Sequence, residues 1–135
     1  FGNKLAGGNN GIVDLYFNLE TGAQSLGRVL VFGDSYARQM SQLIAFVADE
    51  VLFMRTPFLH PEVARDMKPD LVLTQNAERY LSHVQSDEQR PVFHLFPFFK
   101  EQPVQFDPQA ARALSAVLSF GRAPYQAFRD SLSRS

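Results

Sequence analysis

The clearest pattern in the chain is an apolar run, Val29–Phe32, that leads directly into Gly-Asp-Ser. All four residues are apolar, so both faces of a strand formed by them would be apolar, which is typical of a central strand in a parallel sheet. The segment 36–48 that follows predicts an amphipathic helix, since its apolar residues recur at helical spacing: Met40, Leu43, Ile44 and Val47. A strand, a sharp turn and a helix are therefore expected in direct succession.

Similar alternations of apolar runs and helical patterns continue downstream. Two further short apolar runs predict strands at 50–54 and 71–74, the latter a buried strand. Helices are predicted from His60 through Met67, with Pro61 in the first turn, and over 76–84. This β-α-β-α-β-α order predicts an α/β fold, with a doubly wound parallel sheet and right-handed crossovers.

The two ends of the chain give weaker patterns. Residues 1–11 are rich in Gly and Asn and predict a loop or a poorly ordered end, and 12–17 predicts a short strand or an edge segment. Residues 92–96 favour a fourth strand. Two helices are expected near the C-terminus, one from Pro108 to about Leu118 and one from Pro124 to Leu132.

Composition limits the classes of function. A length of 135 residues predicts one domain, 1–135. The net charge of −1 gives no electrostatic reason to expect nucleic acid or an anionic membrane. No cysteine is present, no His/Asp/Glu spacing predicts a metal site, no cofactor motif is found, and no apolar run approaches the ~18 residues of a membrane span. Because the chain begins at Phe1, we expect a processed or excised piece, incomplete at its N-terminus.

The candidate chemistry lies at the strand ends. Ser35 would stand at the end of the first buried strand, where Gly33 relieves crowding in a sharp turn that presents a nucleophile. An oxyanion would need preorganised donors, which the Ser35 N–H and the side-chain amide of Gln75 or Asn76 can supply. In a 2-1-3 strand order these two strand ends are neighbours.

Each candidate has a plainer alternative. The plainer alternative for Asp34 and Ser35 is that they cap the helix and have no chemical role. Asp34 in particular is expected to organise the turn. His60 is the candidate base nearest in sequence, or simply a residue at a helix start. Arg79 can bind substrate or pair with a neighbouring carboxylate. His83 and His94 are weaker candidates for the base, and the phenylalanines of 93–99 can form a sugar platform or pack in a core.

The segment RVLVFGDSY resembles the nucleophile block of the SGNH (GDS-type) hydrolase superfamily. PDLVLTQNAERYL is similar to the branch of that superfamily that includes the alginate O-acetylation proteins. The resemblance covers Arg28 to Leu81. It implies a three-layer, flavodoxin-like fold, with Ser35 in the position of the nucleophile. It also implies transfer or hydrolysis of an acetyl group on a carbohydrate, and it favours the cell envelope or periplasm.

The chain lacks the motifs that supply the catalytic base and part of the oxyanion hole in this family. It has no late Asp-x-x-His, no Asp-x-His before Ser35, and no Gly-x-Asn-Asp oxyanion block. Two hypotheses follow: a serine-dependent O-acyltransferase or esterase whose base lies elsewhere, or a non-catalytic SGNH-fold binding or scaffold domain. A third hypothesis is phosphate binding at the helix start after Ser35. The acyl group, the acceptor and the oligomeric state stay open.

Overall fold

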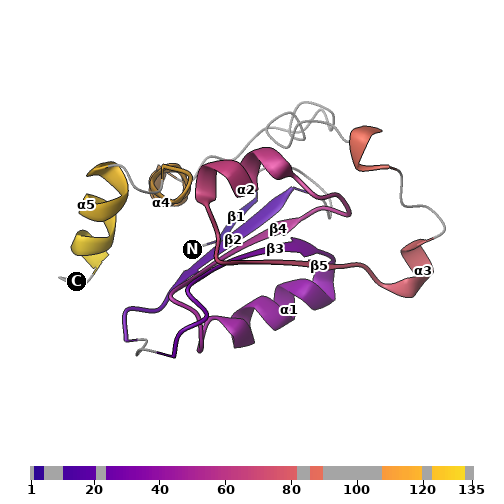
Figure 1. The fold of residues 1–135 in the computed structure, drawn as a ribbon, viewed down its shortest axis with the longest axis horizontal. Coiled ribbons are helices and arrows are strands. Elements are labelled where there is room, and N and C mark those ends of the chain that lie inside the picture. The colour runs from indigo at the N-terminus through magenta and orange to yellow at the C-terminus, as the bar shows by residue number, and fades with distance from the viewer. Residues whose placement is uncertain are drawn as a thin grey trace.

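A computed structural model describes residues 2–4, 11–20, 24–81, 86–89, 108–119 and 123–132 (Figure 1). It contains a five-stranded sheet in the order β1-β2-β4-β3-β5. Helix α1 lies on one side of the sheet and α2 on the other (Figure 1). The α/β class predicted from the sequence is confirmed.

Three parallel strands form the centre of this sheet. Strands β3 (Arg28–Gly33), β4 (Glu50–Arg55) and β5 (Leu71–Gln75) follow the predicted runs, and β3 pairs with the other two. Gly33 is in register with Arg55 on one side and with Gln75 on the other. The carboxyl ends of the three strands therefore meet at one edge, which we call the carboxyl edge, and the predicted 2-1-3 order is present.

The sheet as a whole is mixed, so the expectation of a wholly parallel sheet is wrong. Strand β2 (Ile12–Phe17) pairs antiparallel with β4, and β1 (Gly2–Lys4) pairs antiparallel with β2. The prediction of a loop over residues 1–11 is thus wrong at β1. Backbone groups along an open edge need partners whatever the side chains, so a stretch without an apolar pattern can still become a strand.

The described residues also form five helices and one 3-10 turn. Helix α1 (Ser35–Ile44), α2 (Pro61–Met67) and the short α3 (Glu78–Leu81) lie within or next to the predicted segments. The prediction that the first helix continues to residue 48 is wrong, because residues 45–47 form a turn. The turn η1 (Asp87–Gln89) comes next, then α4 (Pro108–Val117) and α5 (Ala123–Leu132). The fourth strand expected at 92–96 lies outside the described residues.

Two apolar clusters fill the space on either side of the sheet. One packs β2, β3 and β4 against α2 and α4 through side chains that include Leu30, Phe32, Met54, Met67 and Val117. The other lies under α1 and contains Val29, Val31, Ala37, Ala48, Val51 and Phe53. Because successive side chains of β3 enter opposite clusters, every residue of this strand is buried.

The structure corrects two expectations about burial. In α1, Ala37 and Ser41 face the sheet, whereas Met40 and Leu43 are exposed, as is Val47 in the turn after the helix. Small residues bring the helix backbone close to the sheet, and the larger apolar residues then point outward. The prediction of a buried strand at 71–74 is wrong at Leu71 and Val72, which are exposed because β5 is the last strand of the described sheet.

The amino ends of the strands hold a buried ion pair. Arg28 donates to Glu50 Oε1 from Nε at 3.2 Å and from Nη2 at 2.9 Å. The same guanidinium donates to the carbonyls of Met67, in α2, and Val117, in α4. Since both charged side chains are almost fully buried, this cluster joins two strands and two helices at the end of the sheet opposite Ser35.

Candidate functional site

The turn after β3 is braced by the carboxylate of Asp34. Asp34 is the N-cap of α1, and its Oδ1 accepts a hydrogen bond from the Tyr36 N–H at 2.8 Å. Its Oδ2 accepts from the Ala77 N–H at 3.0 Å, just beyond the end of β5. One side chain therefore fixes both the start of the helix and the neighbouring strand end, as expected of a residue that organises the turn.

Gly33 permits a close approach between β3 and β5. A Cβ atom at this position would lie 2.6 Å from the Gln75 carbonyl oxygen and 2.5 Å from Ala37 Cβ. Neither distance is possible for real atoms, so any larger residue would push the strands or α1 apart. The glycine before the serine is needed for space at the carboxyl edge.

Ser35 is the first residue of α1 and is exposed. No described residue forms a side-chain hydrogen bond with its hydroxyl. Its backbone N–H lies in the first turn of a ten-residue helix, where N–H groups lack partners within the helix and favour negative charge. An accessible hydroxyl therefore stands at the positive end of a helix.

Gln75 and Asn76 lie at the end of β5, but only Gln75 is close to Gly33. Gln75 Oε1 is buried without a hydrogen-bond partner in the described part of the chain, and it lies 3.3 Å from the position of a Gly33 Cβ. Asn76 Nδ2 instead donates to the Pro57 carbonyl at 3.3 Å. The amide oxygen of Gln75 thus has no partner among the described residues, whereas the amide of Asn76 holds the loop after β4.

His60 is completely buried and belongs to a chain of three side chains. Its Nε2 lies 3.1 Å from Thr56 Oγ1, and its Nδ1 lies 3.1 Å from Glu62 Oε1. Its ring also packs on Phe32, with ring centroids 5.7 Å apart. This hydroxyl–imidazole–carboxylate arrangement is one in which a carboxylate orients a histidine.

The structure does not bring His60 to Ser35 by a hydrogen bond within the described residues. Ser35 begins α1, whereas His60 is the N-cap of α2 on the other side of the sheet (Figure 1). The sequence did not point to Thr56 or Glu62. A hydroxyl four residues before a histidine and a carboxylate two residues after it were the only available signals.

The remaining sequence candidates are placed as follows. Arg79 is exposed in α3, beyond the end of β5. His83, His94 and the phenylalanines of 93–99 lie outside the described residues. Arg79 therefore lies on the carboxyl side of the sheet.

An ion pair next to Ser35 was also missed by the sequence reasoning. Arg38, three residues after Ser35 on α1, donates to buried Asp14 of β2 through both Nε and Nη2, the latter at 2.9 Å. This hydrogen bond raises the pKa of Arg38. Burial, and then the charge of Asp14, raises the pKa of Tyr16 above its usual 10.0. Asp14 thus holds Arg38 against the sheet.

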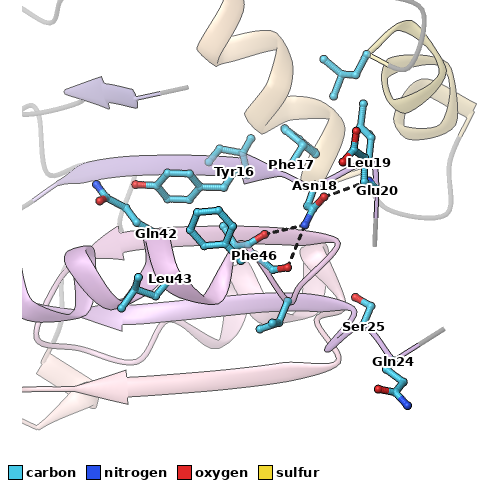
Figure 2. Close-up of a pocket in the computed structure, with 14 residues that line it drawn as sticks. Tyr16, Phe17, Asn18, Leu19, Glu20, Gln24, Ser25, Gln42, Leu43 and Phe46 are labelled. Carbon is cyan, nitrogen blue, oxygen red and sulfur yellow. Dashed lines mark hydrogen bonds between the residues drawn. The ribbon is translucent and has the colours of Figure 1, made fainter. Parts of the chain in front are cut away.

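A broad groove of about 1370 Å³ lies beside the C-terminal end of α1 (Figure 2). Tyr16 and Asn18 line it from the β2 side, Leu43 lines it from α1, and Phe46 lines it from the turn after α1. Asn18 Nδ2 donates to the carbonyls of Ala45 and Phe46, which fixes the end of the helix at the groove. Ser35 does not line this groove, so the groove is separate from the candidate nucleophile.

Two classes of site receive no structural support in the described part of the chain. No group of three His, Cys, Asp or Glu side chains there is arranged to hold a metal ion. None of the described helices combines the length and the apolar character needed to cross a membrane. The candidate chemistry therefore rests on the serine, the amide and the Asp34 turn.

Comparison of the chain with protein-family models, with curated proteins and with solved structures finds no match.

Proposed function

We propose that this chain is the SGNH-like domain of a serine-dependent O-acyltransferase or esterase that acts on a carbohydrate. The observation that carries the proposal is the placement of Ser35. Its exposed hydroxyl follows a fully buried parallel strand, on a turn whose Asp34 carboxylate is bonded to both α1 and the end of β5. The resemblance of the Gly-Asp-Ser segment to SGNH hydrolases supplies the reaction class.

In the proposed reaction, Ser35 Oγ attacks the acyl carbon of an ester and gives its proton to a base. Negative charge then develops on the carbonyl oxygen. The Ser35 N–H and the Gln75 amide are the proposed donors to it, since a 180° turn of that amide exchanges the buried oxygen for its NH₂ group. The alcohol leaves with a proton, and a sugar hydroxyl or water removes the acyl group from Ser35. Arg79 is the proposed contact to the substrate.

The base is the part of this proposal that depends on a rearrangement. Glu62 already orients the Nδ1 side of His60, which leaves Nε2 as the proton acceptor. His60 would act on Ser35 only after Nε2 exchanges Thr56 for the serine hydroxyl. A base supplied from outside the described residues would leave the Thr56–His60–Glu62 chain intact.

The second candidate function is a non-catalytic binding or scaffold domain of the same fold. The specific observation in its favour is that both ring nitrogens of His60 have partners other than Ser35. In that case the Asp34 turn would serve as a helix cap and nothing more.

The test is acylation of Ser35. The chain is incubated with p-nitrophenyl acetate and, separately, with a fluorophosphonate probe, and the labelled residue is identified by mass spectrometry. We expect label on Ser35 and a loss of roughly 10³-fold or more in turnover for Ser35→Ala. Ser115→Ala is the matched control, because Ser115 is exposed in α4. Turnover unchanged in Ser35→Ala contradicts the enzyme proposal, and a wild-type chain with neither turnover nor label favours the binding domain.

A further inference from the structure

The outward side of α1 and the turn after it carry a row of large apolar residues. Tyr36 is 56% exposed, Met40 44%, Leu43 69% and Val47 53%. Phe46, beside them, is 75% exposed. Side chains of this size in one continuous patch are unusual on a surface that has no partner, and such patches mark interaction sites.

The spacing of the row is symmetric. The intervals between positions 36, 40, 43 and 47 are four, three and four residues. Tyr36, Met40 and Leu43 lie on α1 at the spacing at which apolar residues line one side of a helix that pairs with another, and Val47 lies in the turn that follows the helix. The pattern reads the same in both directions about the midpoint between Met40 and Leu43. Two copies of α1 packed antiparallel about a two-fold axis would therefore place Met40 against Leu43 of the second copy, and Tyr36 near the turn of the second copy that carries Val47.

The charges of α1 permit this pairing. Arg38 is the one charged residue in Ser35–Ile44, and its guanidinium is bonded to Asp14 of its own chain. The positions that flank the apolar row on α1 include Gln39 and Gln42, which are neutral. Pairing α1 with a second α1 therefore brings no like charges together, whereas most solvent-facing helices carry charges that would repel an identical copy.

The area is sufficient for a weak but specific dimer. Five side chains that are about half to three-quarters exposed offer on the order of 500 Å² per copy, or roughly 1,000 Å² for two, which is near the lower limit for specific interfaces. The groove in Figure 2 shares Leu43, Phe46 and Val47 with the row, so it borders the same surface.

We propose that the outward side of α1 is the interface of a two-fold symmetric homodimer. The exposed row has a self-matching spacing, it opposes no like charges, and it offers the area that such an interface needs. The inference does not depend on the chemistry of Ser35.

The first test is the oligomeric state by sedimentation velocity from about 1 to 300 µM. We expect a concentration-dependent dimer, with a dissociation constant on the order of 10 to 100 µM. Leu43→Glu should leave the chain monomeric throughout, because it buries two carboxylates near the axis. Gln126→Glu, an equal change on the exposed side of α5, should not alter the dimer. A wild-type monomer at 300 µM, or a Leu43→Glu variant that still dimerises equally well, overturns the proposal.

The second test reads the register, since the chain has no cysteine of its own. Met40→Cys and Leu43→Cys copies are mixed in equal amounts and oxidised. Antiparallel pairing predicts a mixed disulfide well above the half expected from random collision, while Gln126→Cys copies should cross-link only weakly. Random proportions contradict the proposed register. A wild-type monomer that binds lipid vesicles would assign this surface to a membrane and would also overturn the dimer.

Discussion

The two ends of strand β3 are both polar, but they are built differently. At the amino end, Arg28 is buried and its guanidinium is bonded to Glu50 and to two backbone carbonyls. At the carboxyl end, Ser35 is exposed and Gln75 Oε1 is buried without a partner in the described chain. At the amino end the guanidinium of Arg28 has several hydrogen-bond partners, whereas at the carboxyl end the Ser35 hydroxyl and Gln75 Oε1 have none among the described residues.

This difference indicates that the amino end of β3 contributes mainly to stability and the carboxyl end mainly to chemistry. A buried charge without its partners is costly, so the amino end tolerates little change and offers nothing to a ligand. Buried polar atoms without partners are uncommon in folded proteins, and here the Gln75 Oε1 atom lies near Gly33, two residues before the candidate nucleophile. Substitutions at the amino end should therefore reduce the free energy of unfolding, and those at the carboxyl end should mainly alter reactivity.

The largest effect is expected at the amino end, for Glu50→Ala. This change leaves the Arg28 guanidinium buried without its carboxylate, and we expect a loss of about 3–5 kcal/mol in the free energy of unfolding. Urea denaturation followed by circular dichroism measures it. Asp66→Ala, at an exposed position of α2, is the control and should cost less than about 0.5 kcal/mol. A Glu50→Ala loss below about 1 kcal/mol would show that the amino end is not the stabilising region.

Gly33→Ala should give the next largest effect, and it should reduce both the stability of the fold and the reactivity of Ser35. The added methyl group would overlap the Gln75 carbonyl and Ala37, which costs about 1–3 kcal/mol in overpacking. Moving β5 away from β3 also moves Gln75 away from Ser35. Urea denaturation together with the rate of fluorophosphonate labelling measures both losses. An Ala variant with normal stability and a normal labelling rate would contradict the close approach described at this edge.

Asp34→Asn should cost less stability than Gly33→Ala. The amide oxygen can still accept from the Tyr36 N–H, because Asn is a good N-cap, but the amide NH₂ cannot accept from Ala77. We expect a loss of about 1 kcal/mol in urea denaturation. Amide hydrogen exchange should then increase at Ala77 but not at Tyr36. Equal protection of both amides in the variant would show that the carboxylate does not brace β5.

Ser35→Ala should have the smallest effect on stability, so it best distinguishes a loss of reactivity from a loss of stability. Since the hydroxyl is exposed and has no side-chain partner among the described residues, we expect a change within about 0.5 kcal/mol. Thermal unfolding of the variant purified for the acylation assay measures it. A substantial loss of stability would mean that Ser35 is a structural helix residue rather than a free hydroxyl.

Local patterns were enough to predict the central part of the fold. The apolar runs at β3, β4 and β5 and the Pro61 helix start are read directly from neighbouring residues. The side of α1 that faces the sheet was not predictable in the same way. Periodicity shows that one side is apolar, but the packing depends on the small residues Ala37 and Ser41, which fit against the sheet where larger ones would not.

The candidate site was predictable only where it follows the chain. Gly33, Asp34 and Ser35 are consecutive, so the strand-turn-helix pattern placed them together. The partners of His60 could not be foreseen, because which hydroxyl and carboxylate face a ring depends on how the loop after β4 folds back. The pairing of Asp14 with Arg38 likewise requires β2 to lie beside β4, and no residue pattern in β2 indicates its neighbour.

The placement of β2 has a consequence for how the chain folds. Val13 pairs with Met54, so β2 cannot complete its pairing with β4 until 41 further residues have been made. At the usual 5–20 residues per second of synthesis, this corresponds to a wait of about 2–8 s. Because pairings between distant segments form slowly, β2 stays without its β4 partner on the ribosome during this interval, before the helices that cover it exist.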